Sequence, residues 1–364
     1  MIISRTPFRI SFFGGGTDYP GWYRQHGGAV LATTIDKYCY LTCRYLPPFF
    51  EHKYRVVYSF IENAQSIDEI KHPAAREVLK FLNTTRGIEI HHDGDLPARS
   101  GMGSSSAFTV GLLNAMHALR GKRLSKQHLA REAITIEQER LRETVGSQDQ
   151  VMATYGGLNH IRFMQSGEIN VQPVVLPASR LAELNDHLML FYTGIKRTAS
   201  DVASGYVPTL DTRKRQMTAI HDLVEEAMSV LCSDHDLSAF GELLHKGWDL
   251  KRSLAAAVSN TAVDDIYRDA QAEGAIGGKL LGAGGGGFIV LFAPPNKHKA
   301  IRLRLSRLLH VPFRFESFGS RIIFHDEECD YADAEEARGN YTADKAVELD
   351  VATAVHAFPS LAQE

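Results

Sequence analysis

Residues 96–107 carry the residue types that point most plainly to chemistry. They read Leu-Pro-Ala-Arg-Ser-Gly-Met-Gly-Ser-Ser-Ser-Ala and lead into an apolar segment with helical spacing. Glycine allows positive φ angles and close approach to a ligand, and a helix N-terminus offers unpaired N–H groups with a partial positive charge. The stretch therefore predicts a phosphate cradle, although a glycine turn before an ordinary serine N-cap would read the same way. The expected members of the cradle are Arg99, Ser100, Gly101, Met102, Gly103, Ser104, Ser105 and Ser106.

Two further glycine clusters, at residues 14–16 and 282–287, suggest other backbone approaches to a ligand. The later cluster formally matches G-x-G-x-x-G. A dinucleotide-binding fold needs a strand before that pattern and a helix after it, whereas we expect a helical segment before and an apolar strand after. No cluster ends in G-K-[ST]. The pattern therefore excludes both the Rossmann and the P-loop interpretations.

The composition is that of a globular protein and argues against several kinds of partner. The chain has 364 residues, 44% hydrophobic and 23% charged, with a formal net charge of −3. Because no long basic run occurs, we expect no nucleic-acid partner. With no apolar signal segment and no stretch of membrane-spanning length, we expect a cytoplasmic protein without a membrane partner. No disulfide framework is expected from the four scattered cysteines, Cys39, Cys43, Cys232 and Cys329.

Strand-like segments dominate the first half of the chain and helical segments the second, which predicts two domains, 1–185 and 186–364. The tail beyond residue 327 is alanine-rich and acidic. Expected strands cover 5–13, 29–35, 38–45, 54–60, 87–92, 171–176, 188–193, 288–293, 313–318 and 321–325. Expected helices cover 74–82, 105–119, 126–142, 212–231, 237–258 and 262–272, with a basic helix ending at 310.

Three glycine-containing segments, in this order along the chain, resemble the three motifs of the GHMP kinases. They are residues 5–19, residues 96–107 and residues 279–288, which ends Gly-Ala-Gly-Gly-Gly-Gly-Phe. The resemblance spans residues 5 to about 290 and implies an α/β (α+β) two-domain fold. The N-terminal domain would resemble ribosomal protein S5 domain 2 and bind ATP, and the C-terminal domain would be ferredoxin-like.

The resemblance also implies roles for acidic residues between the second and third motifs. Residues 136–150 look like the galactokinase segment that ends Gly-x-x-Asp-Gln, with Asp149 as the general base. The same register makes Glu137 a magnesium ligand, with Glu139 as the competing candidate and a solvated helix face as the structural alternative. Ser105, or else Ser104, would supply the metal-binding hydroxyl. The expected cofactors are thus ATP and Mg²⁺.

The first motif implies a basic partner for the general base. Arg9 matches the motif's basic position and would pair with Asp149 and favour the charge that develops during phosphoryl transfer. A surface cation on a strand is the alternative interpretation of Arg9.

The first motif narrows the acceptor to a sugar. Residues 14–19 read Gly-Gly-Gly-Thr-Asp-Tyr, where galactokinases read Gly-Glu-His-Thr-Asp-Tyr. The glycine version resembles the D-glycero-D-manno-heptose 7-phosphate kinases, which phosphorylate the anomeric hydroxyl to give a 1,7-bisphosphate. Alternatives are a sugar-1-kinase for an unphosphorylated fucose- or galactose-like sugar and a non-catalytic sensor. The resemblance places the acceptor on Gly15, Gly16, Thr17, Asp18, Tyr19, Gly284 and Gly285.

A substrate with a 7-phosphate needs a second anion site. Lys196 and Arg197 follow the strand that opens the second domain, and Arg197 offers a bidentate fork. A basic surface turn is the alternative interpretation. For Asp18 the alternative is an Asx turn before Pro20. The expected partners are therefore ATP and a small sugar phosphate, and a homodimer is among the states that the sequence allows.

Overall fold

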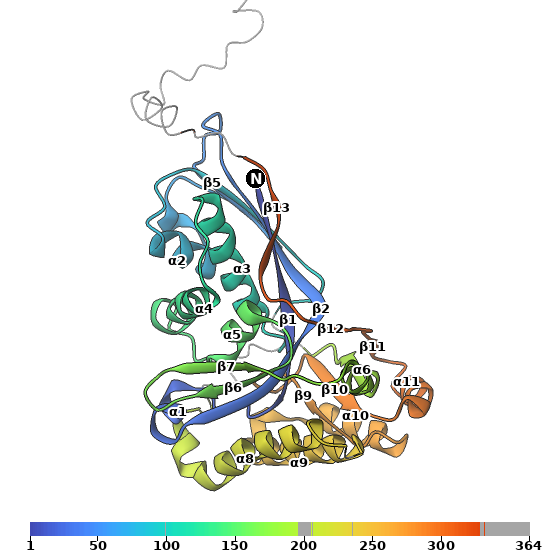
Figure 1. Ribbon diagram of the computed structural model, residues 1–364. Helices are drawn as coiled ribbons and strands as arrows, with labels where there is room; N and C mark the ends of the chain where they lie inside the picture. Colours follow the sequence, from blue (N-terminus) through green and yellow to red (C-terminus); the bar gives the residue numbers. More distant parts are fainter. Residues whose placement is uncertain (99, 196–204, 206, 235, 328–330, 332–364) are drawn as a thin grey trace, which may run out of the picture.

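The computed structural model describes residues 1–98, 100–195, 205, 207–234, 236–327 and 331. Two sheets with helices packed against them make up the architecture, as Figure 1 shows. Long strands of the first sheet run the length of the molecule in this view, and the second sheet lies at the lower right with α8 and α9 beneath it.

The first sheet contains nine strands among the described residues. Its main path runs β13-β1-β2-β5-β3-β4, while β12 pairs with β2 and β6 pairs with both β2 and β7. Only the β3–β5 pair is parallel among the pairings of this sheet in the described chain. The strands are β1 (Ile2–Phe13), β2 (Gly28–Tyr45), β3 (Tyr54–Val57), β4 (Ile61–Ala64), β5 (Ile88–Gly94), β6 (Asn159–Phe163), β7 (Ile169–Pro173), β12 (Phe315–Glu316) and β13 (Arg321–His325).

The long strand β2 corrects one expectation. We expected two strands, over 29–35 and 38–45, but they form one continuous strand of 18 residues. The pairing of β2 with β1 shifts register between Pro7 and Arg9, so a bulge absorbs the irregularity without ending the strand. As a result β1 and β2 cross the whole molecule and connect its two ends.

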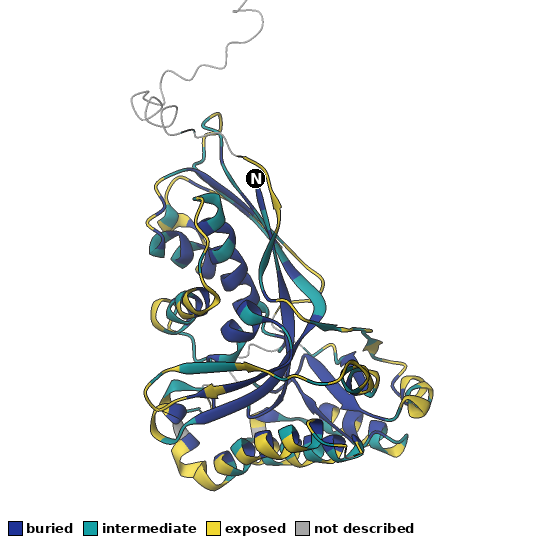
Figure 2. Cartoon of the chain, in the orientation of Figure 1, coloured by how far each residue is buried: buried dark blue, intermediate teal, exposed yellow. Residues whose placement is uncertain are grey.

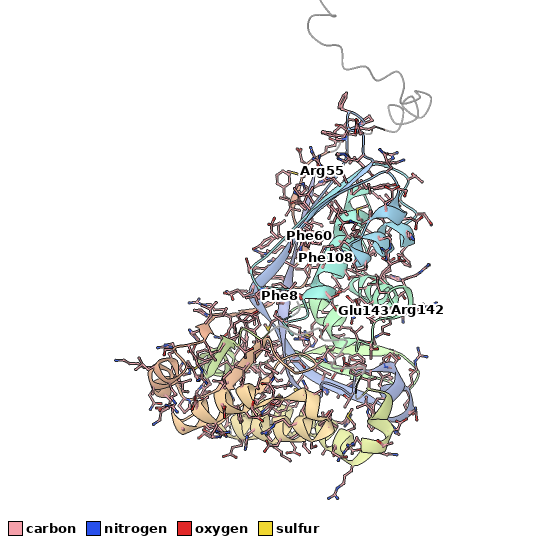
Figure 3. All side chains as sticks on the ribbon, turned by 180° about the vertical axis from the view of Figure 1, so that it is seen from behind. Phe8, Arg55, Phe60, Phe108, Arg142 and Glu143 are labelled. Carbon is pink, nitrogen blue, oxygen red and sulfur yellow. The ribbon has the colours of Figure 1, made fainter. Side chains whose placement is uncertain are left out.

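Helices cover one face of the first sheet (Figure 1). They are α2 (Pro73–Phe81), α3 (Ser104–Leu119), α4 (Lys126–Ile134) and α5 (Gln148–Tyr155), while α1 (Pro20–His26) lies beyond the end of β1. Eleven of the sixteen residues of α3 are buried, because this helix packs on the sheet and under its neighbours. Phe8 of β1 and Phe108 of α3, both labelled in Figure 3, are buried in this shared core.

The helix expected over 126–142 is shorter and changes its winding. α4 ends at Ile134, and residues Thr135–Arg140 continue as a π-helix, the form in which an extra residue enters each turn. Single π-turns often occur at functional sites. α5, which follows, was not expected at all from the sequence.

The second sheet is antiparallel and has the order β11-β8-β10-β9. Its strands are β8 (Leu188–Tyr192), β9 (Gly277–Leu280), β10 (Phe288–Phe292) and β11 (Leu309–His310), and its helices are α6 (Ala178–Asp186), α8 (Lys214–Leu231), α9 (Ser238–Leu254), α10 (Thr261–Ala272) and α11 (His298–Arg304). Short 3₁₀ helices cover Ile67–Glu69, Val207–Arg213, Ala256–Val258 and Pro295–Lys297. In Figure 2 the outer sides of α8 and α9 are exposed and the strands above them are buried.

Strand β9 changes the argument about the third glycine cluster. We expected a helical segment before residues 282–287, and α10 is that segment, but β9 lies between it and the glycines. The exclusion of a dinucleotide fold still stands, because the strand β10 rather than a helix follows the loop.

After the second sheet the chain returns to the first. β12 and β13 pair with β2 and β1, and the backbone N–H of Ser320 donates to Ala153 O of α5 over 2.8 Å. We did not expect this return. The boundary near residue 185 stays a prediction, and residues 315–325 complete the first sheet.

Within the described residues no helix is both long and apolar enough to span a membrane. Cys39 and Cys43 are buried free thiols, and Cys232 is an exposed one.

The segment 315–325, which returns to the first sheet, packs closely against Gly156. Gly156 has a φ of 68°, and a Cβ there would lie 2.0 Å from Phe318 C; Gly167 has a φ of 89° with open space around it. Gly167→Ala should therefore lower the free energy of unfolding by about 1–2 kcal/mol, the cost of a positive φ alone. Gly156→Ala should lower it by at least about 3 kcal/mol, because the added Cβ also meets the main chain. Urea denaturation measures both, and equal losses would contradict the packing described.

Candidate active site

An ion pair between Arg9 and Asp149 lies at the centre of the expected site. Arg9 is on β1, and Asp149 is in the first turn of α5. The Nε atom of Arg9 donates to Asp149 Oδ1 over 2.7 Å, and Nη2 donates to Oδ2 over 2.8 Å. The Arg9 side chain is 5% exposed and that of Asp149 is 26% exposed. The guanidinium therefore orients a carboxylate that keeps one open side.

Arg9 also connects this pair to the glycine-rich cradle. Its Nη1 donates to Gly101 O over 2.6 Å, and its backbone N–H donates to Met102 O over 3.2 Å. Gly103, with a φ of 76°, is the N-cap of α3. The N-terminus of this helix, with its partial positive charge, thus lies beside the Arg9–Asp149 pair, where an anion would be favoured.

The serines of the cradle differ in exposure. Ser105 is exposed, whereas Ser106 is buried and its hydroxyl donates to Glu137 Oε2 over 2.9 Å. The hydroxyl of Ser100 is buried and has no hydrogen-bond partner among the described residues.

The third glycine cluster lies directly on the cradle. A Cβ at Gly101 would lie 2.5 Å from Leu281 O, and a Cβ at Gly282 would lie 2.6 Å from the Cα of Gly101. The N–H of Phe288 donates to Ser100 O over 3.2 Å. Only glycine permits this backbone contact, so the third motif supports the phosphate cradle from behind.

Gly284 and Gly285, expected at the acceptor, face the turn after α9. A Cβ at Gly284 would lie 2.6 Å from Val258 O, and the N–H of Gly285 donates to the same oxygen over 3.0 Å. Asn260 Nδ2 donates to Gly285 O over 3.1 Å. The backbone of Gly284 and Gly285 therefore contacts the segment 258–260 of the protein itself.

Glu137 is buried where the π-helix passes α5. Its Oε2 accepts from Ser106 and from Gln150 Nε2, the latter over 2.5 Å, while its Oε1 has no partner within the described chain. Burial raises the pKa of Glu137 to about 8, although the bonds from Ser106 and Gln150 lower it. Glu139, the competing candidate, is exposed.

A magnesium ion fits these donors. The Oε1 atom of Glu137 is a hard oxygen donor without a hydrogen-bond partner in the described chain, and a cation beside it would reduce the cost of burying its charge. The described residues contain no cluster of three or more His, Cys, Asp or Glu ligands. Magnesium held by one carboxylate and a serine hydroxyl would complete its shell with phosphate oxygens and water.

The loop after β1 holds a second buried carboxylate. Asp18 is 1% exposed; its Oδ1 accepts from the N–H of Gly16 over 2.9 Å and its Oδ2 from that of Gln148 over 3.2 Å. Burial raises the pKa of Asp18, while these two N–H bonds oppose the rise. A Cβ at Gly146 would lie 1.9 Å from Asp18 Oδ2, so the glycine turn before Asp149 makes room for this carboxylate.

The other residues expected to bind the acceptor differ in their exposure to solvent. Thr17 is fully buried, and its hydroxyl bonds to Gly14 O and Ala29 O over 2.8 and 2.9 Å, which is a structural function. Gly15 and Tyr19 are partly exposed, and Gly16 is buried with a φ of 109°. Three other expected residues, Arg99, Lys196 and Arg197, lie outside the described residues.

Two buried lysines near the site were not among the residues expected from the sequence. Lys251 of α9 is 8% exposed and donates to Gly282 O, and Lys279 of β9 is 7% exposed and donates from Nζ to Phe12 O over 2.8 Å. Burial lowers the pKa of Lys251 to about 8 and that of Lys279 well below its usual value. Lys279 opens the third motif and could have been noticed there, whereas nothing local marks Lys251.

A cavity of about 390 Å³ opens beside the cradle. Leu96 and Pro97 line it from the segment before Ser100, and Phe288, whose N–H bonds to Ser100, lines it from the second sheet. Tyr192, Leu309 and Pro312 complete an apolar wall.

Fold, motifs and site together define a kinase class. Models of the GHMP kinases N-terminal domain and the GHMP kinases C-terminal region match residues 69–157 and 220–310. The chain belongs to the GHMP kinase family and is an ATP-dependent phosphotransferase.

The chain is also similar to individual proteins of known sequence or structure. The chain is 30% identical over 317 residues to a D-glycero-alpha-D-manno-heptose 7-phosphate kinase of Campylobacter jejuni, covering 81% of this chain and 90% of that protein. It is 26% identical over 336 residues to a bifunctional fucokinase/GDP-fucose pyrophosphorylase of Arabidopsis thaliana, covering 84% of this chain and 31% of that protein. The crystal structure of a D-glycero-D-manno-heptose 1-phosphate kinase from Bacteroides thetaiotaomicron superposes with a TM-score of 0.73 at 22% identity, covering 90% and 100% of the two chains, and shows the shared fold.

The lowered pKa of Lys251 predicts how stability changes with pH. Between pH 8 and about 10.4 the unfolded chain keeps a proton that the folded Lys251 has released, so the free energy of unfolding contributed by this residue rises with pH. Lys251→Met should therefore lose that rise relative to the native protein in urea denaturation at pH 7.5, 8.5 and 9.5. Lys246→Met, on the exposed side of the same helix, is the control. Parallel pH curves for the native protein and Lys251→Met would contradict the burial of a charged ammonium.

Proposed function

We propose that this protein transfers the γ-phosphoryl group of ATP to the anomeric hydroxyl of D-glycero-D-manno-heptose 7-phosphate, giving the 1,7-bisphosphate. The observation that carries the transfer is the carboxylate of Asp149, fixed by Arg9 next to the N-terminus of α3. The similarity to the Campylobacter jejuni heptose 7-phosphate kinase, over nine tenths of that protein, supports the choice of acceptor.

The residues of the site divide the chemistry among them. N–H groups of the cradle from Gly101 to Ser106 would hold the β- and γ-phosphates. Glu137 and a serine at the start of α3 would hold magnesium, which neutralises phosphate charge when bound. Asp149 would accept the proton of the anomeric hydroxyl as its oxygen bonds to the γ-phosphorus, and the electron pair of the breaking bond would stay with ADP. An anomeric hydroxyl is more acidic than an ordinary alcohol, which eases the task of Asp149.

A fucose-like sugar is the second candidate acceptor. The match to the plant fucokinase covers most of this chain and favours it. The two acceptors differ by a phosphate, so they differ in the need for an anion site remote from the reacting hydroxyl. Lys196 and Arg197 remain our proposal for that site.

Product analysis decides between these acceptors. The protein is incubated with ATP, magnesium and a panel of free sugars and sugar 7-phosphates, and phosphorus NMR follows the products. A new anomeric phosphate with the heptose 7-phosphate alone is the expected result. Transfer to free sugars alone would establish the second candidate, and transfer to no acceptor would favour a sensor.

Asp149→Asn tests the assigned base. The amide cannot accept the proton but has nearly the same shape, so turnover should fall by about 10²–10⁴-fold while nucleotide binding changes little. Turnover is measured by coupled ADP release and nucleotide binding by calorimetry. Asp265→Asn, an exposed acid on α10, is the matched control. Retained turnover in Asp149→Asn would show that another group takes the proton.

The apolar cavity beside Ser100 is our proposed site for the nucleotide base. Leu309 is 66% exposed at its wall, and Leu303 of α11 is 67% exposed and does not line the cavity. Leu309→Asp should raise the KM for ATP about tenfold and leave the KM for the sugar unchanged, because a carboxylate would be desolvated against the base. Steady-state kinetics compares it with Leu303→Asp. Equal KM values for ATP in the two variants would place the base elsewhere.

A further inference from the structure

All three nitrogens of Arg9 are held by protein acceptors. Nε and Nη2 hold Asp149, and Nη1 holds Gly101 O. Three of the five N–H donors of the guanidinium are used in this way, and two remain. Arg9 is well placed to orient the base, but a phosphoryl group in transit carries charge on three oxygens and needs donors of its own.

Lys251 offers further donors next to the cradle. Its Nζ donates to Gly282 O, and Gly282 lies against Gly101, the residue held by Arg9. An ammonium carries three N–H donors, so two remain beyond the bond to Gly282. Lys251 keeps 8% of its surface exposed.

A small cavity adjoins Lys251. With Lys279 it lines a space of about 20 Å³ beside Gly14 and Gly15, large enough for a single water, and the rest of the lining is apolar or glycine. Lys279 spends a donor on Phe12 O and so anchors the end of β1.

The charged groups that act on Lys251 come from several elements. They are Arg9 of β1, Asp18 of the following loop, Asp149 of α5 and Lys279 of β9. Together with Lys251 these groups comprise three basic and two acidic side chains, although burial lowers the pKa of Lys279 well below its usual value. A bound phosphoryl group would favour the charged form of Lys251.

We propose that Lys251 contacts the oxygens of the phosphoryl group as it passes from ATP to the acceptor. This inference rests on the proposed function. As the acceptor oxygen bonds to the γ-phosphorus, the bond to the bridging oxygen of ADP breaks with its electron pair, and the acceptor proton moves to Asp149. Lys251 forms no covalent bond; it supplies positive charge and two N–H donors, which is how lysine binds phosphate.

A purely structural role for Lys251 would lead to a different pattern of nucleotide affinities. If the lysine only held Gly282 against the cradle, its loss would weaken the binding of every nucleotide that uses the cradle. If it contacts the γ-phosphoryl oxygens, its loss should discriminate between nucleotides with and without that group. The comparison therefore needs ADP and the non-hydrolysable ATP analogue AMPPNP, each with magnesium.

Calorimetry on the full-length protein makes this comparison. Lys251→Met should bind AMPPNP about tenfold more weakly, since a charged hydrogen bond is lost, and ADP within about twofold of the native protein. Lys246→Met, an exposed lysine on the same helix paired with Glu226, should match the native protein for both nucleotides. Equal losses for ADP and AMPPNP in Lys251→Met, or no loss, would overturn the proposal.

Kinetics supplies the second readout. Lys251→Met should lower kcat about 100-fold with little change in the KM for the acceptor, because the contact is strongest in the transition state. Since burial lowers the pKa of Lys251 to about 8 in the free protein, native kcat/KM for ATP should fall as pH rises through that value. Lys251→Arg keeps its charge and should remove this fall.

The two levels of the proposal can fail separately. If the native protein transfers phosphate to a sugar and Lys251→Met retains full kcat, the role of Lys251 is wrong and the kinase function stands. If the native protein transfers phosphate to no acceptor, the proposed function is wrong, and the ADP and AMPPNP affinities still decide whether Lys251 contacts the terminal phosphate.

Discussion

The two-point ion pair between Arg9 and Asp149 is the contact on which the rest of the site depends. It joins β1 to the first turn of α5, and the third bond of Arg9 reaches Gly101 of the cradle. The pair is partly buried, with side-chain exposures of 5% and 26%. The same contact thus holds the proposed base in place, contacts the cradle and ties two distant segments of the chain together.

Close backbone packing supplies the second constraint. The loop 282–287 lies against Gly101 and Ser100 at distances that leave no space for a side chain. The cradle is therefore supported by main chain rather than by adaptable side chains, which favours the preorganisation that phosphoryl transfer requires. Helix α9 joins this arrangement through Lys251 and brings a cation from the second sheet's side of the molecule.

Much of the site could be predicted from the sequence because its chemistry is carried by short motifs. The resemblance of three ordered motifs to the GHMP kinases implied Arg9, Asp149 and Glu137, whose roles stay predictions, and the family is confirmed by the comparisons. Local patterns could not reveal the return of β12 and β13, because that pairing depends on residues about 280 to 320 positions apart. Lys251 was missed for the same reason: its significance comes from Gly282, on a different element.

A crystal structure with AMPPNP, magnesium and D-glycero-D-manno-heptose 7-phosphate would test the central claim most directly, namely that Asp149 is the base held by Arg9 at the phosphate cradle. The account predicts the anomeric oxygen within about 2.6–3.2 Å of a carboxylate oxygen of Asp149 and in line with the γ-phosphorus, with Arg9 still bound to Asp149. An acceptor hydroxyl in line with the γ-phosphorus but out of reach of Asp149 would contradict it.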